Sequence, residues 1–137
     1  MKFRVHCLWL CLVSLPALAT GESLVVNVSG IKAGEGDVRV GVFDAEEAFP
    51  NGTGITGVEL AADAETMRIE VTGLSPGRYA ISVMQDLNGN KKLDTNFFGS
   101  PKEPYGFSGK WKSGRASFED ALIELVSGGS EISIRMK

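Results

Sequence analysis

The sequence predicts an all-β protein, a single antiparallel β-sandwich of about seven strands with one long loop at residues 86–115. Two observations carry this prediction. Apolar and polar residues alternate over short runs, which is the period of a half-buried strand. Gly, Pro, Asn and Asp, the residues of turns, separate these runs. At 137 residues, 43% of them hydrophobic, the chain is long enough for one domain and short for two.

Seven segments are expected to form strands, at residues 24–29, 38–43, 57–61, 67–71, 78–84, 121–126 and 131–136. In the first two, Leu24, Val26 and Val28 share one face, as do the valines at positions 38, 40 and 42. No stretch after residue 20 keeps apolar residues at helical spacing over three turns, and residues 45–48 suggest a single helical turn.

The corner before the fifth expected strand indicates which type of β-sandwich to expect. The expected strand that ends at Val71 is followed, after Thr-Gly-Leu, by a Ser-Pro-Gly turn, and Tyr79 then opens the next strand. In immunoglobulin-like sandwiches a tyrosine at such a corner sends its hydroxyl back to a backbone group a few residues upstream. We therefore expect an immunoglobulin-like sandwich in which Tyr79 has this structural role.

The first nineteen residues have the features of a signal peptide. Lys2 and Arg4 form a basic start, an apolar run follows at residues 5–15, and residues 17–19 are an Ala-Leu-Ala cleavage motif. The run is shorter than the roughly 20 residues that a permanent span requires. We expect cleavage after residue 19, a sandwich domain over residues 20–137 with no membrane span, and a periplasmic or secreted location.

Cleavage would leave a mature chain without cysteine or histidine, because His6, Cys7 and Cys11 all precede residue 20. That composition excludes disulfides, thiolate nucleophiles, Ser-His-Asp catalysis, haem ligation by histidine and zinc sites of Cys and His. Lipid attachment at Cys11 is the alternative to cleavage, but the preceding Leu-Trp-Leu lacks the small residues usual before a lipidated cysteine.

The charge of the mature chain argues against nucleic acid as a partner. It has twelve Lys and Arg against seventeen Asp and Glu, a net charge of −5. Binding to nucleic acid depends on clustered cations that neutralise phosphates. We therefore expect an unknown ligand or an envelope protein as the partner.

The start of the 86–115 loop has the oxygen spacing of a calcium-binding loop. The candidate metal ligands are the side chains of Asp86, Asn88, Asn90 and Asp94 and the carbonyl of Lys92, at relative positions 1, 3, 5, 9 and 7. Lys91 replaces the usual Gly at position 6, and Phe97 replaces the closing Glu at position 12. The alternative is a series of Asx turns in which these side chains bond their own backbone.

The second half of the loop is rich in aromatic residues, Gly and Pro. The candidate ligand-binding residues are Phe98, Glu103, Tyr105, Phe107 and Trp111. Rigid rings on a loop offer large apolar faces to a sugar or a peptide at low entropic cost. The alternative is that Phe98, Tyr105 and Phe107 fold back as a small core under the loop.

Linked motifs give the chain a family resemblance over residues 22–137. They are Leu-Ser-Pro-Gly-Arg-Tyr-Ala from residue 74, Gln-Asp-Leu-Asn-Gly-Asn from 85, Pro-Lys-Glu-Pro-Tyr-Gly-Phe-Ser from 101, and Glu-Glu-Ala-Phe-Pro from 46. Together they resemble a bacterial exported family catalogued as domain of unknown function 2141. The resemblance implies a sandwich similar to transthyretin-like and carboxypeptidase-regulatory-like domains, and no activity comes with it. That family usually has Gly at the position of Lys91.

Two functional hypotheses follow. The first is a non-enzymatic, exported module of the cell envelope that uses the 86–115 loop for binding or as an accessory surface, with no catalytic residue and with calcium as the one candidate cofactor. The second is a hydrolase of envelope glycans, with a carboxylate pair drawn from Asp94, Glu103, Glu119 and Asp120. A cleft with two carboxylates about 5 to 9.5 Å apart would favour the enzyme.

Overall fold

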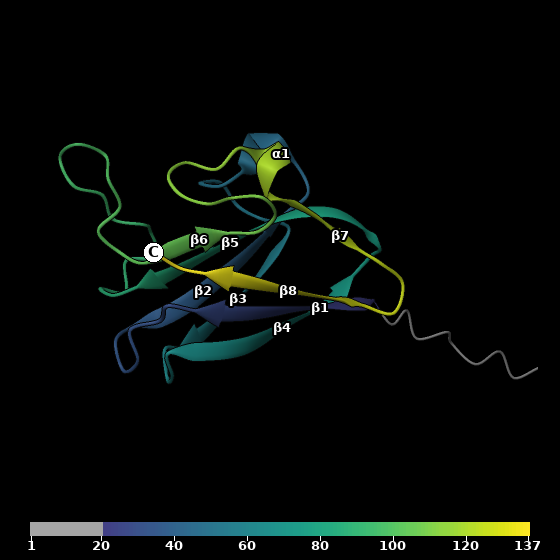
Figure 1. The fold of residues 1–137 in the computed structure, drawn as a ribbon, viewed down its shortest axis with the longest axis horizontal. Coiled ribbons are helices and arrows are strands. Elements are labelled where there is room, and N and C mark those ends of the chain that lie inside the picture. Colours follow the sequence, from purple (N-terminus) through teal and green to yellow (C-terminus); the bar gives the residue numbers. More distant parts are fainter. Residues whose placement is uncertain (1–20) are drawn as a thin grey trace, which may run out of the picture.

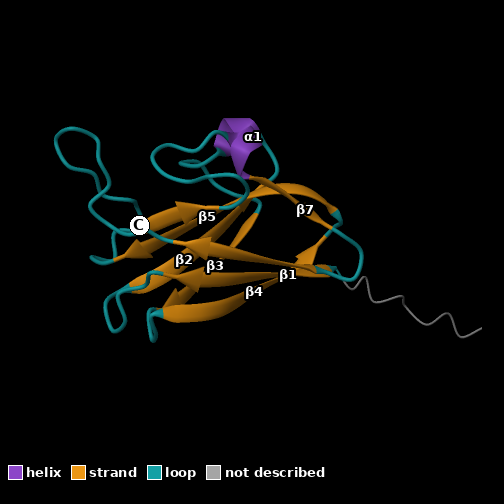
Figure 2. Ribbon diagram, viewed as in Figure 1, coloured by secondary structure: helices purple, strands orange, loops and turns teal. Residues whose placement is uncertain are grey.

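The computed structural model describes residues 21–137, so the expected signal peptide lies outside the described residues. Within that range the chain is nearly all β (Figures 1 and 2). The strands are β1 (Glu22–Ser29), β2 (Asp37–Phe43), β3 (Thr56–Ala61), β4 (Thr66–Leu74), β5 (Gly77–Asp86), β6 (Tyr105–Phe107), β7 (Leu122–Leu125) and β8 (Ser130–Arg135). Two short helical turns, η1 (Glu46–Ala48) and α1 (Phe118–Ala121), complete the elements. All seven expected strands are present, and so is the expected turn near residues 45–48.

The strands form two sheets that pack as a sandwich. One sheet has the order β4-β1-β8, and the other has the order β3-β2-β5-β6, with β7 also paired to β5. Figure 1 shows β8, β1 and β4 side by side in front of the second sheet. The predicted β-sandwich is therefore confirmed.

One strand pair departs from the antiparallel pattern. β1 and β8 pair in parallel, from Leu24 opposite Ser130 to Ser29 opposite Arg135. Parallel partners need a long connection, and here the whole second sheet lies between them in the chain. Alternation along a strand reports which face is buried and says nothing of the direction of its neighbour, so the sequence did not predict this pair.

The core lies between the sheets and is built from the alternating faces. Its buried members include Leu24, Val26 and Val28 of β1, Val38, Val40 and Val42 of β2, Ile69 and Val71 of β4, Ile81 and Val83 of β5, and Ile134 of β8. Because side chains alternate across a strand, the intervening residues of β2 and β5 face the other side of the second sheet.

The predicted tyrosine corner is confirmed. Tyr79 is buried in the core, and its hydroxyl donates a 2.7 Å hydrogen bond to the carbonyl oxygen of Ser75, four residues upstream. This bond holds the turn between β4 and β5, where the chain passes from one sheet to the other.

A second apolar cluster covers the outer face of β2 and β5. Phe43, Ala80 and Ala121 are buried there, and Ala48, Phe49, Phe107 and Phe118 pack against them. Phe49 contacts Phe43, Phe107 and Phe118 edge to face, with ring centroids 5.4 to 5.9 Å apart. The cluster therefore joins η1, α1 and the end of the long loop to the sandwich.

Candidate functional site

The long loop leaves the end of β5 and contains a strand that the sequence did not predict. β6 pairs with β5 from Ser82 opposite Phe107 to Met84 opposite Tyr105. A three-residue strand is too short to show alternation, which is why it was missed. The loop region of residues 86–115 is therefore divided into an asparagine-rich turn, a projecting hairpin at residues 94–102, and the return through β6.

β6 and β7 share one edge of β5, and Ser108 fills the gap between them. β7 pairs with β5 up to Ala80, and β6 pairs with it from Ser82 onward. At Ile81 the backbone N–H donates to the Ser108 hydroxyl at 2.8 Å, and the Ser108 N–H donates back to the Ile81 carbonyl at 3.0 Å. The Ser108 hydroxyl also donates to the carbonyl of Ala121. This serine thus fixes where the loop rejoins the sheet.

The asparagine-rich turn is anchored by the buried carboxylate of Asp86. One of its oxygens accepts from the N–H of Gly89 and the other from the N–H of Lys91, both at 2.8 Å. Lys91 has φ 63°, a left-handed conformation that costs a non-glycine residue on the order of 1 kcal/mol. Arg39 of β2 donates a 2.6 Å hydrogen bond to the Lys91 carbonyl. These contacts hold the lysine where calcium loops have glycine.

The two asparagines form successive Asx turns and meet at Asp94. The side-chain oxygen of Asn88 accepts from the N–H of Asn90 at 3.1 Å, and that of Asn90 accepts from Lys92 at 2.9 Å. Both amide groups donate to the carboxylate of Asp94, from Asn90 at 2.8 Å. The structure thus joins the side chains of Asn88, Asn90 and Asp94, while the Asp86 side chain bonds backbone N–H groups of the same turn. These are the hydrogen bonds that the turn alternative requires.

A calcium ion would find two carboxylates and two amide oxygens in this turn. The carboxylate oxygens of Asp86 and Asp94 already accept hydrogen bonds, so an ion would have to displace the amide donors at Asp94. Across residues 21–137 there is no group of three or more His, Cys, Asp or Glu placed to hold a metal. Calcium binding stays a prediction.

Glu103 has a structural position within the loop. Its side chain is 5% exposed, and its two carboxylate oxygens accept from the N–H of Leu87 at 2.8 Å and of Asp94 at 2.9 Å. Glu103 therefore ties the beginning of the asparagine-rich turn to the base of the hairpin. Both oxygens have backbone partners, which argues against the ligand-binding role expected for this residue.

Gln85 secures the strand end from which the loop leaves. This fully buried side chain donates to the carbonyls of Lys32 and Glu35, at 2.8 and 2.6 Å, and accepts from the N–H of Lys32 at 2.8 Å. It thereby clamps the turn between β1 and β2 to the end of β5. Nothing in the alternation marks a glutamine for this role, although Gln85 opens one of the linked motifs.

The hairpin at residues 94–102 is ordered by its own polar groups. Asn96 donates from its backbone N–H to the Ser100 carbonyl at 2.8 Å, and its side-chain oxygen accepts from the N–H groups of Phe98 and Ser100 at 2.9 and 3.0 Å. The N–H of Lys102 donates to the Asp94 carbonyl at 2.7 Å. In Figure 1 this green hairpin extends away from the sheets, near the end of β5.

Two phenylalanines stand exposed at the tip of the hairpin. Phe97 is 97% exposed and Phe98 is 88% exposed, and their rings touch edge to face with centroids 5.5 Å apart. The expectation that Phe98 folds back into a small core is wrong, because residues 96–100 turn within the hairpin and leave its ring in solvent. Phe97 was not among the expected binding residues, because it was considered only as the residue at position 12 of the calcium spacing, where calcium loops have Glu.

The other aromatic candidates pack together at the base of the loop. Tyr105 contacts Phe107 and Trp111, and Phe107 contacts Trp111, with centroids 5.4 to 5.9 Å apart. The Lys137 ammonium lies 5.5 Å from the centroid of the Trp111 ring. For Tyr105 and Phe107 the small-core alternative describes the structure. All three rings are partly exposed.

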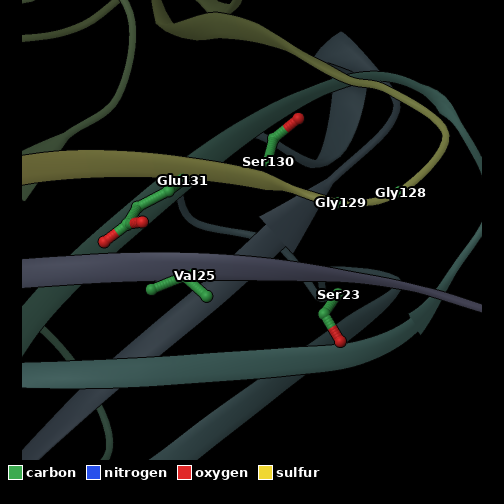
Figure 3. Close-up of a pocket in the computed structure, with 6 residues that line it drawn as sticks. All are labelled: Ser23, Val25, Gly128, Gly129, Ser130 and Glu131. Atoms are coloured by element: carbon green, nitrogen blue, oxygen red, sulfur yellow. The ribbon is translucent and has the colours of Figure 1, made fainter.

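A surface pocket of about 260 Å³ lies elsewhere, at the joined ends of β1 and β8. Figure 3 shows its lining, Ser23, Val25, Gly128, Gly129, Ser130 and Glu131. It contains one carboxylate, and Glu131 accepts a 2.7 Å hydrogen bond from the Asn27 amide. This pocket therefore lacks the carboxylate pair that the hydrolase hypothesis needs, and Asp94, Glu103, Glu119 and Asp120 do not line it.

Within residues 21–137 no helix is long and apolar enough to cross a membrane.

Comparison with known proteins assigns the chain to a family but gives no activity. No curated protein and no solved structure matches the chain significantly. The model of one family, described as an uncharacterized protein conserved in bacteria (DUF2141), matches residues 26–133. That match spans both sheets and the long loop, and the chain therefore belongs to the DUF2141 family.

Proposed function

We propose that this protein is an exported, non-enzymatic module of the cell envelope that binds its partner with the hairpin of the 86–115 loop. The observation that carries the proposal is the contrast between the base of the loop and its tip. Gln85, Asp86 and Glu103 are buried and hydrogen-bonded to backbone, whereas Phe97 and Phe98 are almost wholly exposed.

Such an arrangement suits binding because the hairpin is already ordered in the folded protein. The loss of conformational entropy from ordering it occurs during folding, before the partner binds. A loop held in its bound shape loses less freedom when its partner arrives. Two adjacent exposed rings are also uncommon on a monomer that has no use for them, because large apolar side chains are stabilised by leaving water. The sandwich supplies a rigid support and the hairpin supplies the contact.

The carboxylates favour this proposal over the hydrolase alternative. Glu103 has both oxygens committed to backbone N–H groups, and Asp94 is held by the amides of Asn88 and Asn90. Glu119 and Asp120 are exposed on α1. A glycosidase pair needs two carboxylates that face each other across a substrate cleft, one of them free to move a proton.

The proposal is tested by binding of the purified exported protein to isolated envelope material that contains membrane, glycan and protein. Wild type is compared with Phe97→Ser/Phe98→Ser, and with Ile55→Ser/Val126→Ser as the control, because Ile55 and Val126 are half-exposed and lie outside the loop. We expect the tip variant to lose at least about tenfold in affinity, the effect of one apolar ring leaving its partner, and the control to bind as wild type does. Equal binding by all three proteins would contradict the proposal that the hairpin is the binding surface.

A further inference from the structure

The charge of the chain is divided unevenly between the long loop and the rest of the domain. Residues 86–115 hold six Lys and Arg against three Asp and Glu, while the remainder of residues 20–137 holds six against fourteen. Two of the three acids in the loop, Asp86 and Glu103, are buried. A cationic loop thus stands on an anionic body.

Three of the loop cations flank the hairpin that carries the exposed phenylalanines. Lys102 lies at the base of the hairpin, where its N–H bonds the Asp94 carbonyl, and Lys91 and Lys92 lie in the turn just before that base. All three side chains are exposed. In an anionic bilayer the phosphates lie outside the hydrocarbon. Apolar rings at the tip can therefore reach the hydrocarbon boundary while ammonium groups nearer the base contact the phosphates.

From this placement we propose that the hairpin binds the surface of an anionic phospholipid bilayer. Phe97 and Phe98 enter the headgroup and acyl boundary, and Lys91, Lys92 and Lys102 contact lipid phosphates. The proposal rests on the binding function of the hairpin and names its partner. Repulsion between the anionic body and the same membrane would turn the loop toward the bilayer, so charge sets the orientation as well as the attraction.

The shape of the tip favours a membrane over a protein partner. Two phenyl rings bury together about 300 to 500 Å², whereas a stable protein interface covers about 800 Å² on each partner. The rings stand on a projecting hairpin with their faces in solvent. Interfacial anchoring needs only a few apolar groups together with charge attraction, and it gives weak, reversible binding.

Sedimentation with lipid vesicles tests the proposal on the purified exported protein. Vesicles of phosphatidylcholine alone are compared with vesicles that also contain phosphatidylglycerol, at low and high salt. We expect binding to the anionic vesicles that weakens with salt. We also expect a loss of about tenfold or more in partition coefficient for Phe97→Ser/Phe98→Ser. Absence of binding to both kinds of vesicle would overturn the proposal.

Matched variants separate the tip from general charge. Lys91→Gln/Lys92→Gln/Lys102→Gln should weaken binding to anionic vesicles, whereas Lys32→Gln/Arg68→Gln/Arg135→Gln, which removes three exposed cations from the body, should weaken it much less. Melting temperatures of all variants confirm that each is folded. Equal losses in the two sets would contradict the assignment to the hairpin.

Insertion has a spectroscopic test. In the exported form without residues 1–19, which include Trp9, Trp111→Phe together with Phe98→Trp leaves a single indole at the tip. Its emission should shift to the blue on anionic vesicles and be quenched by brominated acyl chains. Unshifted emission from the bound protein would overturn insertion.

If the protein binds envelope material through Phe97 and Phe98 but does not bind lipid vesicles, the binding function stands and the lipid partner is wrong. A self-associated form that Phe97→Ser/Phe98→Ser dissociates would assign the tip to a second copy instead.

Discussion

Glu103 and Tyr79 show how single side chains hold the fold in this protein. Each is buried and hydrogen-bonds to the backbone. Tyr79 bonds a carbonyl four residues upstream, and Glu103 bonds N–H groups sixteen and nine residues upstream. The role of Tyr79 could be predicted, because the Pro-Gly corner and the tyrosine lie within a few residues of one another. The role of Glu103 could not, because its partners Leu87 and Asp94 come near it only when the loop folds.

Replacement of Tyr79 tests the corner. Tyr79→Phe removes the hydroxyl that bonds the Ser75 carbonyl and should lower the free energy of unfolding by about 1 kcal/mol, the usual net contribution of one hydrogen bond. Tyr105→Phe is the control, because the Tyr105 hydroxyl has no hydrogen bond within residues 21–137. Urea unfolding curves of the two variants check this, and coincidence of Tyr79→Phe with wild type would contradict the corner.

Replacement of Glu103 tests the tie within the loop. Glu103→Gln keeps the size but turns one acceptor into an amide donor that faces a backbone N–H. A buried donor without a partner costs about 1 to 3 kcal/mol, so the variant should be less stable by that amount. Glu119→Gln, at an exposed position of α1, should change the stability little. Similar urea midpoints for the two variants would argue that Glu103 does not hold the loop.

At the scale of elements, the asparagine-rich turn has enough hydrogen bonds of its own to be ordered without an ion. We therefore expect the same melting temperature in EDTA and in about 10 mM calcium, a concentration well above the dissociation constants of weak extracellular calcium sites. We also expect Asp86→Ala to lower the melting temperature equally in both conditions. A bound ion would instead stabilise the fold by up to about 2.7 kcal/mol at a hundredfold excess over its Kd. A calcium-dependent rise in Tm that Asp86→Ala abolishes would contradict the self-ordered turn.

The elements also show what alternation can and cannot predict. It located β1, β2 and β5 because each has one face in the core, and apolar residues at every second position mark that face. It missed β6, which has three residues, and the parallel pairing of β1 with β8. For Phe98 the sequence left open a ligand-binding role or a place in a small core, because an aromatic residue in a sequence carries no sign of the side to which a hairpin turns it.

Binding of the whole molecule to the cell envelope, as proposed, requires that the protein be exported. If the leader is removed after residue 19, the exported form begins at Thr20 and contains neither cysteine nor histidine. Intact-mass measurement of the protein recovered from outside the cytoplasm checks this. A retained Met1, or a diacylglycerol on Cys11, would contradict the expected processing.

Hydrogen exchange of the exported protein, alone and with envelope material, locates the bound surface without any substitution. If the hairpin is the binding surface, backbone amides in residues 94–102 gain protection and those in the sheets change little, since the sandwich only supports the hairpin. Protection centred on another surface, such as the exposed edge strand β3 or the pocket at Ser23 and Glu131, with residues 94–102 unchanged, would contradict it.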